Sequence, residues 1–140
     1  MSNRMSHISK YTRSYLDREL DGTGIDGSSF GTMMYLFRKQ GITEKEISEH
    51  MLVDKATTTR TISKLEGFGY IRRKRDPSDR RAYRVYLTEK AEKVKSDLMM
   101  VRDRWVDIVL KDMSRTEKDE ILELLHRMEK NLEESRDGGF

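Results

Sequence analysis

The sequence predicts a mainly α-helical fold that carries one small β-hairpin and has long helices at both ends. Over most of the chain, apolar residues recur at steps of three and four, which is the period of an amphipathic helix. The period changes only in residues 70–75 and 82–87, which are rich in β-branched and aromatic residues and flank the turn-forming sequence DPSD. These two segments predict the strands of a hairpin.

The composition narrows the class of protein. The 140 residues include no cysteine, which excludes disulfides and thiolate metal sites. No stretch approaches the roughly 18 to 20 apolar residues that cross a bilayer, and the first residues lack the apolar centre of a signal peptide. We therefore expect a single cytoplasmic domain without a membrane partner.

Two helices are predicted in the first part of the chain. The first covers about residues 5–20, and the sequence DGTGIDGSS ends it. The second begins near Ser28 or Ser29 and stops at Gly41. Both have an apolar face that suits a core.

Two capping signals mark the next pair of helices. Thr43 and Glu46 have the spacing of a capping box, in which the hydroxyl and the carboxylate satisfy free backbone donors, so a short helix should run through His50. After the turn sequence MLVD, Asp54 can cap a helix of about a dozen residues that the glycines of GFG end.

Two long helices follow the hairpin. Thr88 caps the first of them, and Ser114 with Glu117 forms a second capping box that opens the last. Two short helices, a tight turn between them and a hairpin after them have the order of a winged helix-turn-helix. We expect residues 25–88 to form this unit.

Positive charge is concentrated on residues 55–84. The whole chain has a net charge of +3, but this segment alone carries +7, so the remainder carries −4. A local basic segment of this kind is typical of a face that meets a polyanion. An ordinary solvated surface is the alternative.

The predicted helix after Asp54 has two unlike faces. Thr58, Ile62 and Leu65 fall on one side and suit a core. The other side carries small polar residues, which let a helix enter the major groove, and Arg60, which can make a bidentate contact to guanine. An ordinary surface helix is again the alternative. The DNA-contacting residues predicted here are Lys55, Ala56, Thr57, Thr59, Arg60, Ser63 and, as a phosphate contact, Lys64.

The hairpin adds a second group of cations. Successive strand residues point to opposite faces, so at most half of residues 72–75 can contact DNA. These side chains suit phosphates, whereas an arginine at the turn can enter a narrow minor groove. Asp79 is placed to pair with an arginine and hold it extended. The DNA-binding residues predicted on the hairpin are Arg73, Arg75, Asp79, Arg80 and Arg81.

The sequence DPSDRRAYRVYLT is similar to the wing signature of the MarR family of bacterial and archaeal transcription regulators, and GIDGSSFGTMMYL is similar to that family's second helix. The resemblance covers nearly the whole chain. It implies that Arg81 enters the minor groove and that Asp79 braces it. The chain departs from the family pattern at Thr58 and Thr61, where aliphatic residues are common, which puts the base contacts in doubt.

The resemblance also implies an obligate homodimer, with a repressor as the expected role. Residues 1–24 and 89–140 would form the dimerisation region around the DNA-binding region of residues 25–88. Apolar stripes on the terminal helices agree, because they offer more surface than one small body covers. The alternative is that they cover only their own domain. A two-fold dimer would place recognition helices about 34 Å apart on a palindromic operator of double-stranded DNA.

Members of this family often sense small anionic aromatic molecules between the dimerisation helices and the winged domain. For such an aromatic acid effector, the resemblance makes Lys10 and Arg13 candidate carboxylate partners and makes Tyr11 and Tyr35 candidate aromatic walls. The alternative is that these are surface charges and core tyrosines. No cofactor is expected.

The sequence does not favour an enzyme or a metal protein. His7, His50 and His126 lie on different predicted helices, and none has a neighbouring motif for nucleophile activation or metal binding. The stronger rival is a winged helix that binds an acidic partner protein. The small polar residues of the fourth helix and the arginine at the turn favour DNA over that partner.

Overall fold

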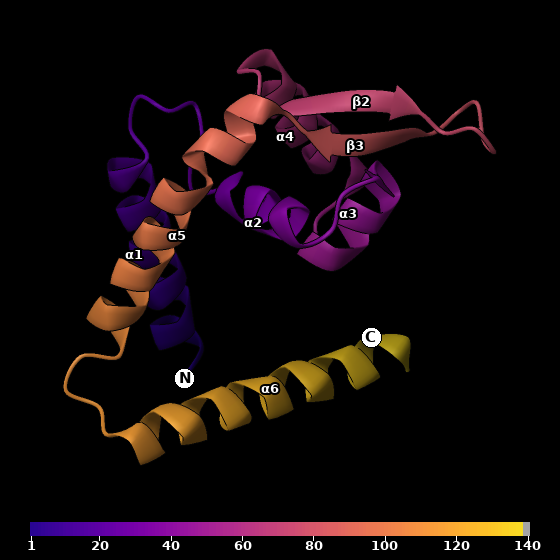
Figure 1. The fold of residues 1–140 in the computed structure, drawn as a ribbon. Coiled ribbons are helices and arrows are strands. Elements are labelled where there is room, and N and C mark those ends of the chain that lie inside the picture. Colours follow the sequence, from indigo (N-terminus) through magenta and orange to yellow (C-terminus); the bar gives the residue numbers. More distant parts are fainter. Residues whose placement is uncertain (139–140) are drawn as a thin grey trace. The chain divides into compact units, whose positions relative to one another are not determined.

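The computed structural model describes residues 1–138, and it confirms the predicted fold class, mainly α-helical with a small hairpin (Figure 1). Residues 1–103 form one compact unit, and the described chain from Arg104 onward forms a second. Within the described part of the chain, no helix is both long and apolar enough to span a membrane. The elements are α1 (Ser2–Glu19), α2 (Phe30–Arg38), β1 (Ile42–Thr43), α3 (Glu44–Met51), α4 (Lys55–Gly67), β2 (Ile71–Arg75), β3 (Tyr83–Leu87), α5 (Glu89–Val109) and α6 (Arg115–Asp137).

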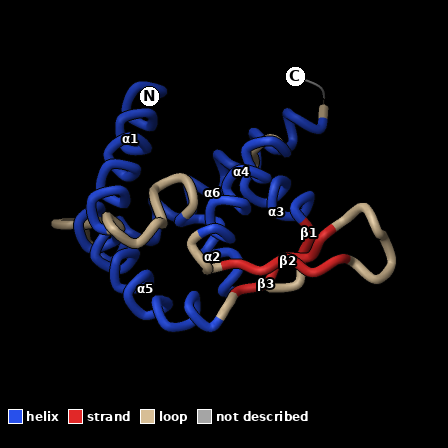
Figure 2. The backbone as a smooth tube through the Cα atoms, turned by 90° about the horizontal axis from the view of Figure 1, so that it is seen from above, coloured by secondary structure: helices blue, strands red, loops and turns tan. Residues whose placement is uncertain are grey.

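The core of the first unit lies where α2, α3 and α4 pack against a small sheet (Figure 2). Leu16 of α1 and Leu20, which directly follows this helix, join the same buried cluster together with Leu98 and Val101 of α5. The long helices therefore contribute to the core of the winged unit. The least exposed apolar side chains are Met33, Leu36, Ile42, Ile47, Ile62, Leu65, Val85, Ala91 and Leu98.

The sheet has three antiparallel strands in the order β1-β3-β2, one strand more than predicted. Ile42 pairs with Val85, and Ile71 pairs with Leu87. A strand of two residues has no alternation to detect, and β1 is followed at once by α3, so hydrophobic periodicity does not predict it. The turn between β2 and β3 projects away from the helices (Figure 1).

The predicted caps of the helix-turn-helix are confirmed. The Thr43 hydroxyl accepts the backbone N–H of Glu46, whose carboxylate accepts the N–H of Thr43 at 2.8 Å. Asp54 accepts the backbone N–H of Thr57 at 2.6 Å. In the turn between them Leu52 has a φ of 55°, in the left-handed region. Both helix starts are thus fixed by local contacts.

Thr58 packs in the core although its hydroxyl is polar. It is 2% exposed, and its hydroxyl lies 2.8 Å from that of Ser48 on α3. Since Ser48 also donates to the carbonyl of Glu44, both hydroxyls are satisfied. The departure from an aliphatic residue at this position therefore adds a polar contact between the two helices of the helix-turn-helix.

Candidate nucleic-acid interface

The outward face of α4 is the first part of the candidate interface. Lys55, Ala56 and Arg60 are exposed on it. The Arg60 guanidinium donates to the hydroxyl of half-buried Thr57 at 3.2 Å. This face therefore offers small residues beside one arginine, which is the surface that the sequence predicts for groove contact.

The flank of α4 that faces the hairpin is tied down by Arg73. Its guanidinium lies 3.3 Å from Glu44 and 3.5 Å from Glu66, and it donates to Ser63 at 2.7 Å. Glu44 also accepts from the hydroxyl of Thr59 at 3.1 Å. The Arg73 side chain is only 22% exposed. Three of the predicted DNA residues, Arg73, Ser63 and Thr59, are thus engaged within the protein, and their DNA role stays a prediction.

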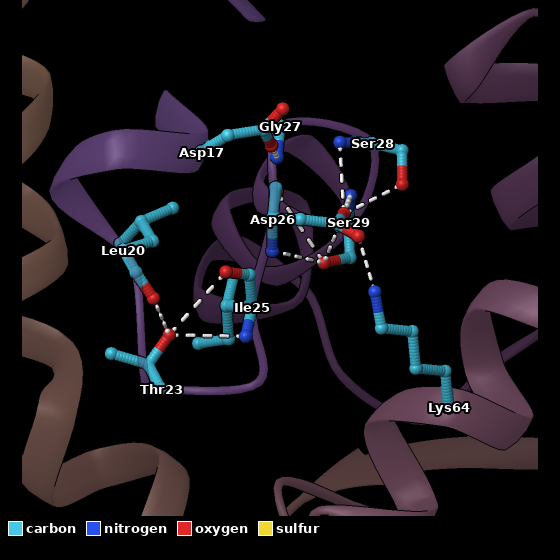
Figure 3. Close-up of polar contacts among 9 residues, drawn as sticks. All are labelled: Asp17, Leu20, Thr23, Ile25, Asp26, Gly27, Ser28, Ser29 and Lys64. Atoms are coloured by element: carbon cyan, nitrogen blue, oxygen red, sulfur yellow. Dashed lines mark hydrogen bonds and ion pairs between the residues drawn. The ribbon is translucent and has the colours of Figure 1, made fainter. Parts of the chain in front are cut away.

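Lys64 lies on the other flank of α4. Its ammonium group forms an ion pair with Asp26, in the loop before α2 (Figure 3). The sequence offered Lys64 as a phosphate contact and gave no role to Asp26. In this structure the two residues join α4 to the loop between α1 and α2.

The base of the wing turn is held by Asp76, which sequence reasoning missed. Asp76 is 6% exposed, accepts the backbone N–H and hydroxyl of Ser78, and lies 3.2 Å from the Arg84 guanidinium. Arg84 also donates to the carbonyl of Gly41 at 2.6 Å. Hydrogen bonds from Ser78 lower the pKa of Asp76 most, and Arg84 lowers it further, so this carboxylate is ionised at neutral pH.

The tip of the wing carries the remaining predicted residues. The Asp79 carboxylate accepts the backbone N–H of Arg81 at 2.9 Å, so it shapes the chain just before that arginine. Arg80 and Arg81 are both exposed. Arg75 donates to the hydroxyl of Tyr83 at 3.1 Å. The bracing of the Arg81 side chain by Asp79 stays a prediction.

One cavity brings the two halves of the candidate interface together. It has a volume of about 260 Å³, and its lining includes Lys55 at the start of α4, Lys45 of α3 and Arg81 on the wing, together with the acidic residues Glu44, Asp76 and Asp79. The start of α4 and Arg81 of the wing are therefore neighbours in space.

Of the four predicted effector residues, Tyr35 lines a described cavity. Tyr35 stacks on His50 with ring centroids 3.7 Å apart, and both line a cavity of about 280 Å³ with Arg38 and Arg102. Lys10, Tyr11 and Arg13 are exposed on α1 and do not line this cavity. Their role toward an effector stays a prediction.

The structure also bears on metal binding. Across residues 1–138, no three side chains of histidine, aspartate or glutamate gather closely enough to hold a metal ion. The charged side chains described above instead pair with one another or face solvent.

A tight pair of capped helices followed by a basic hairpin defines a winged helix-turn-helix protein. The MarR family model matches residues 27–83, which span α2 to the start of β3. The chain belongs to the MarR family of transcriptional regulators. This confirms the resemblance that the wing sequence suggested.

Relatives and solved structures agree with this assignment. The transcriptional regulator BilQ of Clostridioides difficile is 30% identical over 90% of this chain and 85% of its own. A MarR regulator from Methanosarcina mazei is 32% identical, with a TM-score of 0.87 over 94% of this chain and 96% of that one. At 22% identity, MepR of S. aureus, solved with DNA, shares the fold with a TM-score of 0.86 over 93% and 96% of the two chains.

Replacing Arg73 by methionine should lower the free energy of unfolding by about 1 to 3 kcal/mol, because the mostly buried Glu44 carboxylate loses its cation. Urea denaturation followed by circular dichroism measures the change. Arg75→Met is the matched control, since Arg75 is exposed. Equal effects of the two substitutions would contradict the structural role of Arg73.

Proposed function

We propose that the protein is a homodimeric, cytoplasmic repressor that binds a palindromic operator, with α4 in the major groove and the wing in the minor groove. The observation that carries this proposal is the cavity that Lys55 of α4 and Arg81 of the wing share. A duplex presents a major groove and a neighbouring minor groove side by side, so one bound duplex can meet both elements. MepR, which has the same fold, was solved in complex with DNA, and this supports DNA as the ligand of the fold.

The proposed contacts divide by type. Arg60, Ala56 and Thr57 face base edges, because they are short or can donate two hydrogen bonds. Lys55 and Arg75 bind phosphates. Arg80 and Arg81 carry the charge of the wing tip, and Arg81 enters the minor groove. A non-enzymatic role is part of this proposal, because the relatives of the chain are transcriptional regulators.

The test of DNA binding is fluorescence anisotropy with a labelled duplex selected from a random pool. Affinity should fall steeply between about 50 mM and about 200 mM salt, because each neutralised phosphate releases counterions. Competition with an unlabelled scrambled duplex measures how much more tightly the protein binds the selected sequence. Failure to bind any duplex at about 50 mM salt would favour a module that binds an acidic protein.

Replacing Arg81 by alanine should weaken operator binding by about 1 to 3 kcal/mol, the range for one good groove contact. Lys93→Ala on α5 is the control, because it removes the same charge from a side chain that is 75% exposed and away from the wing. Anisotropy titration of both variants measures the difference. An unchanged affinity for Arg81→Ala would refute the minor-groove role.

Dimerisation is proposed for the helices outside the winged unit, residues 1–24 and 89–140, of which 139–140 lie outside the described residues. None of the described residues of α6 is buried within the chain. Its apolar side chains are exposed as well, with Leu122 at 62% and Leu132 at 61%. Exposed apolar side chains in such number are stabilised by a partner surface. Analytical ultracentrifugation should find a dimer at micromolar concentration, and a monomer would contradict the proposal.

An anionic aromatic effector is proposed as the signal that releases DNA. The cavity beside the stacked Tyr35 and His50 supports this, because Arg38 supplies positive charge next to aromatic rings. Arg102 also lines the cavity, but its guanidinium is paired with Asp103 at 2.9 Å. A ligand acts only if it binds one conformation better than the other. Benzoate should then displace the labelled operator, and no displacement at millimolar benzoate would count against this class of effector.

A further inference from the structure

The loop between α1 and α2, residues 20–29, contacts α4 and the segment that follows it. The Thr23 carbonyl accepts the hydroxyl of Tyr70 at 2.5 Å. Gly24 has a φ of +85° and lies so close to Phe68 that a Cβ there would be 2.5 Å from the ring. Side chains are therefore excluded at Gly24, and the loop follows the C-terminal end of α4 closely.

Asp26 is the charged member of this loop and uses its two oxygens differently (Figure 3). Its Oδ1 accepts the backbone N–H groups of Ser28 and Ser29, each at 3.0 Å, and their hydroxyls. Its Oδ2 contacts the ammonium group of Lys64. The turn before α2 and the contact to α4 thus depend on different atoms of one side chain.

The loop itself is anchored to α1. Asp17 of α1 accepts the backbone N–H of Gly27 at 2.7 Å. Burial raises the pKa of Asp26, but hydrogen bonds from Lys64, Ser28 and Ser29 outweigh it and hold the pKa far below its ordinary value. Asp26 therefore carries its charge at any pH at which DNA binding is measured.

The ion pair between Asp26 and Lys64 and the contacts of Arg73 lie on opposite flanks of α4. Lys64 and Glu66 are two residues apart, so they lie about 160° apart around the helix. Glu66 is bound to Arg73 of the hairpin, and Lys64 is bound to Asp26 of the loop. The exposed residues Ala56 and Arg60 lie between these flanks.

We propose that Asp26 is a positioning residue for DNA recognition, and that Lys64 serves as its partner rather than as a phosphate contact. The pair fixes the rotation of α4 about its own axis, which decides where Arg60 points. This inference rests on the proposed function of α4. The pair is 42% and 35% exposed in its side chains, so it contributes little to stability and its loss should leave the fold intact.

The experiment compares four full-length variants and one control variant on the operator duplex selected from a random pool. Asp26→Asn keeps Oδ1 for the turn and removes only the charge that holds Lys64. Asp26→Asn and Lys64→Met should each weaken operator binding about two- to fivefold, the equivalent of one exposed ion pair, and the double variant should be no weaker than the weaker single variant. Lys64→Arg keeps the pair and should bind as the original chain does.

Two further readouts separate positioning from other roles. The slope of log affinity against log salt should not change in any variant, and binding to a scrambled duplex should be unaffected, because no phosphate contact is lost. Asp21→Asn is the matched control. It removes an exposed negative charge from the same loop and should not weaken binding.

Three results would overturn the proposal. Tighter binding by Asp26→Asn, with a slope reduced by about one in Lys64→Met, would make Lys64 a phosphate contact for which Asp26 competes. Unchanged operator affinity in both single variants would remove any positioning role. Additive losses in the double variant would mean that the two residues act separately. If the original chain binds no duplex, the proposed function fails, which is a distinct outcome.

Discussion

The whole arrangement depends on burying one face of α4 while its opposite face stays open to a polyanion. Ile62 and Leu65 are completely buried. Thr58 is buried beside them, and its hydroxyl is hydrogen-bonded to the hydroxyl of Ser48. Burial of two such side chains contributes several kcal/mol, of the order of 2 kcal/mol each, far more than any exposed ion pair. Hydrophobic contacts therefore hold α4 against the core, and we propose that the ion pairs at its flanks adjust its rotation about its own axis.

Charge pairing separates the cations of the winged unit into two groups. Arg73 and Arg84 are held by acidic partners, and so is Lys64. The side chains of Arg80 and Arg81 are exposed at the wing tip. A count of basic residues overstates the charge that can meet DNA, because part of it is already neutralised inside the protein. The paired cations hold elements of the winged unit together, and the exposed cations are the ones that we propose to contact DNA.

Local signals in the sequence predicted much of the fold. The capping box at Thr43, the cap at Asp54 and the hairpin around DPSD each need only residues a few positions apart. The ion pair of Asp26 with Lys64 joins residues 38 positions apart, and no periodicity reports a contact of that kind. The sequences DGTGIDGSS and DPSD predicted the breaks that contain Asp26 and Asp76, but not the cationic partners of these two residues.

In the complex that we propose, α4 occupies the major groove and the wing occupies the minor groove of one duplex. Dimethyl sulfate tests it directly, because it methylates guanine N7 in the major groove and adenine N3 in the minor groove. Bound protein should protect guanine N7 at the centre of each half-site and adenine N3 beside it. Protection of neither position in a duplex that is bound tightly would contradict it, since binding would then involve the phosphate backbone alone.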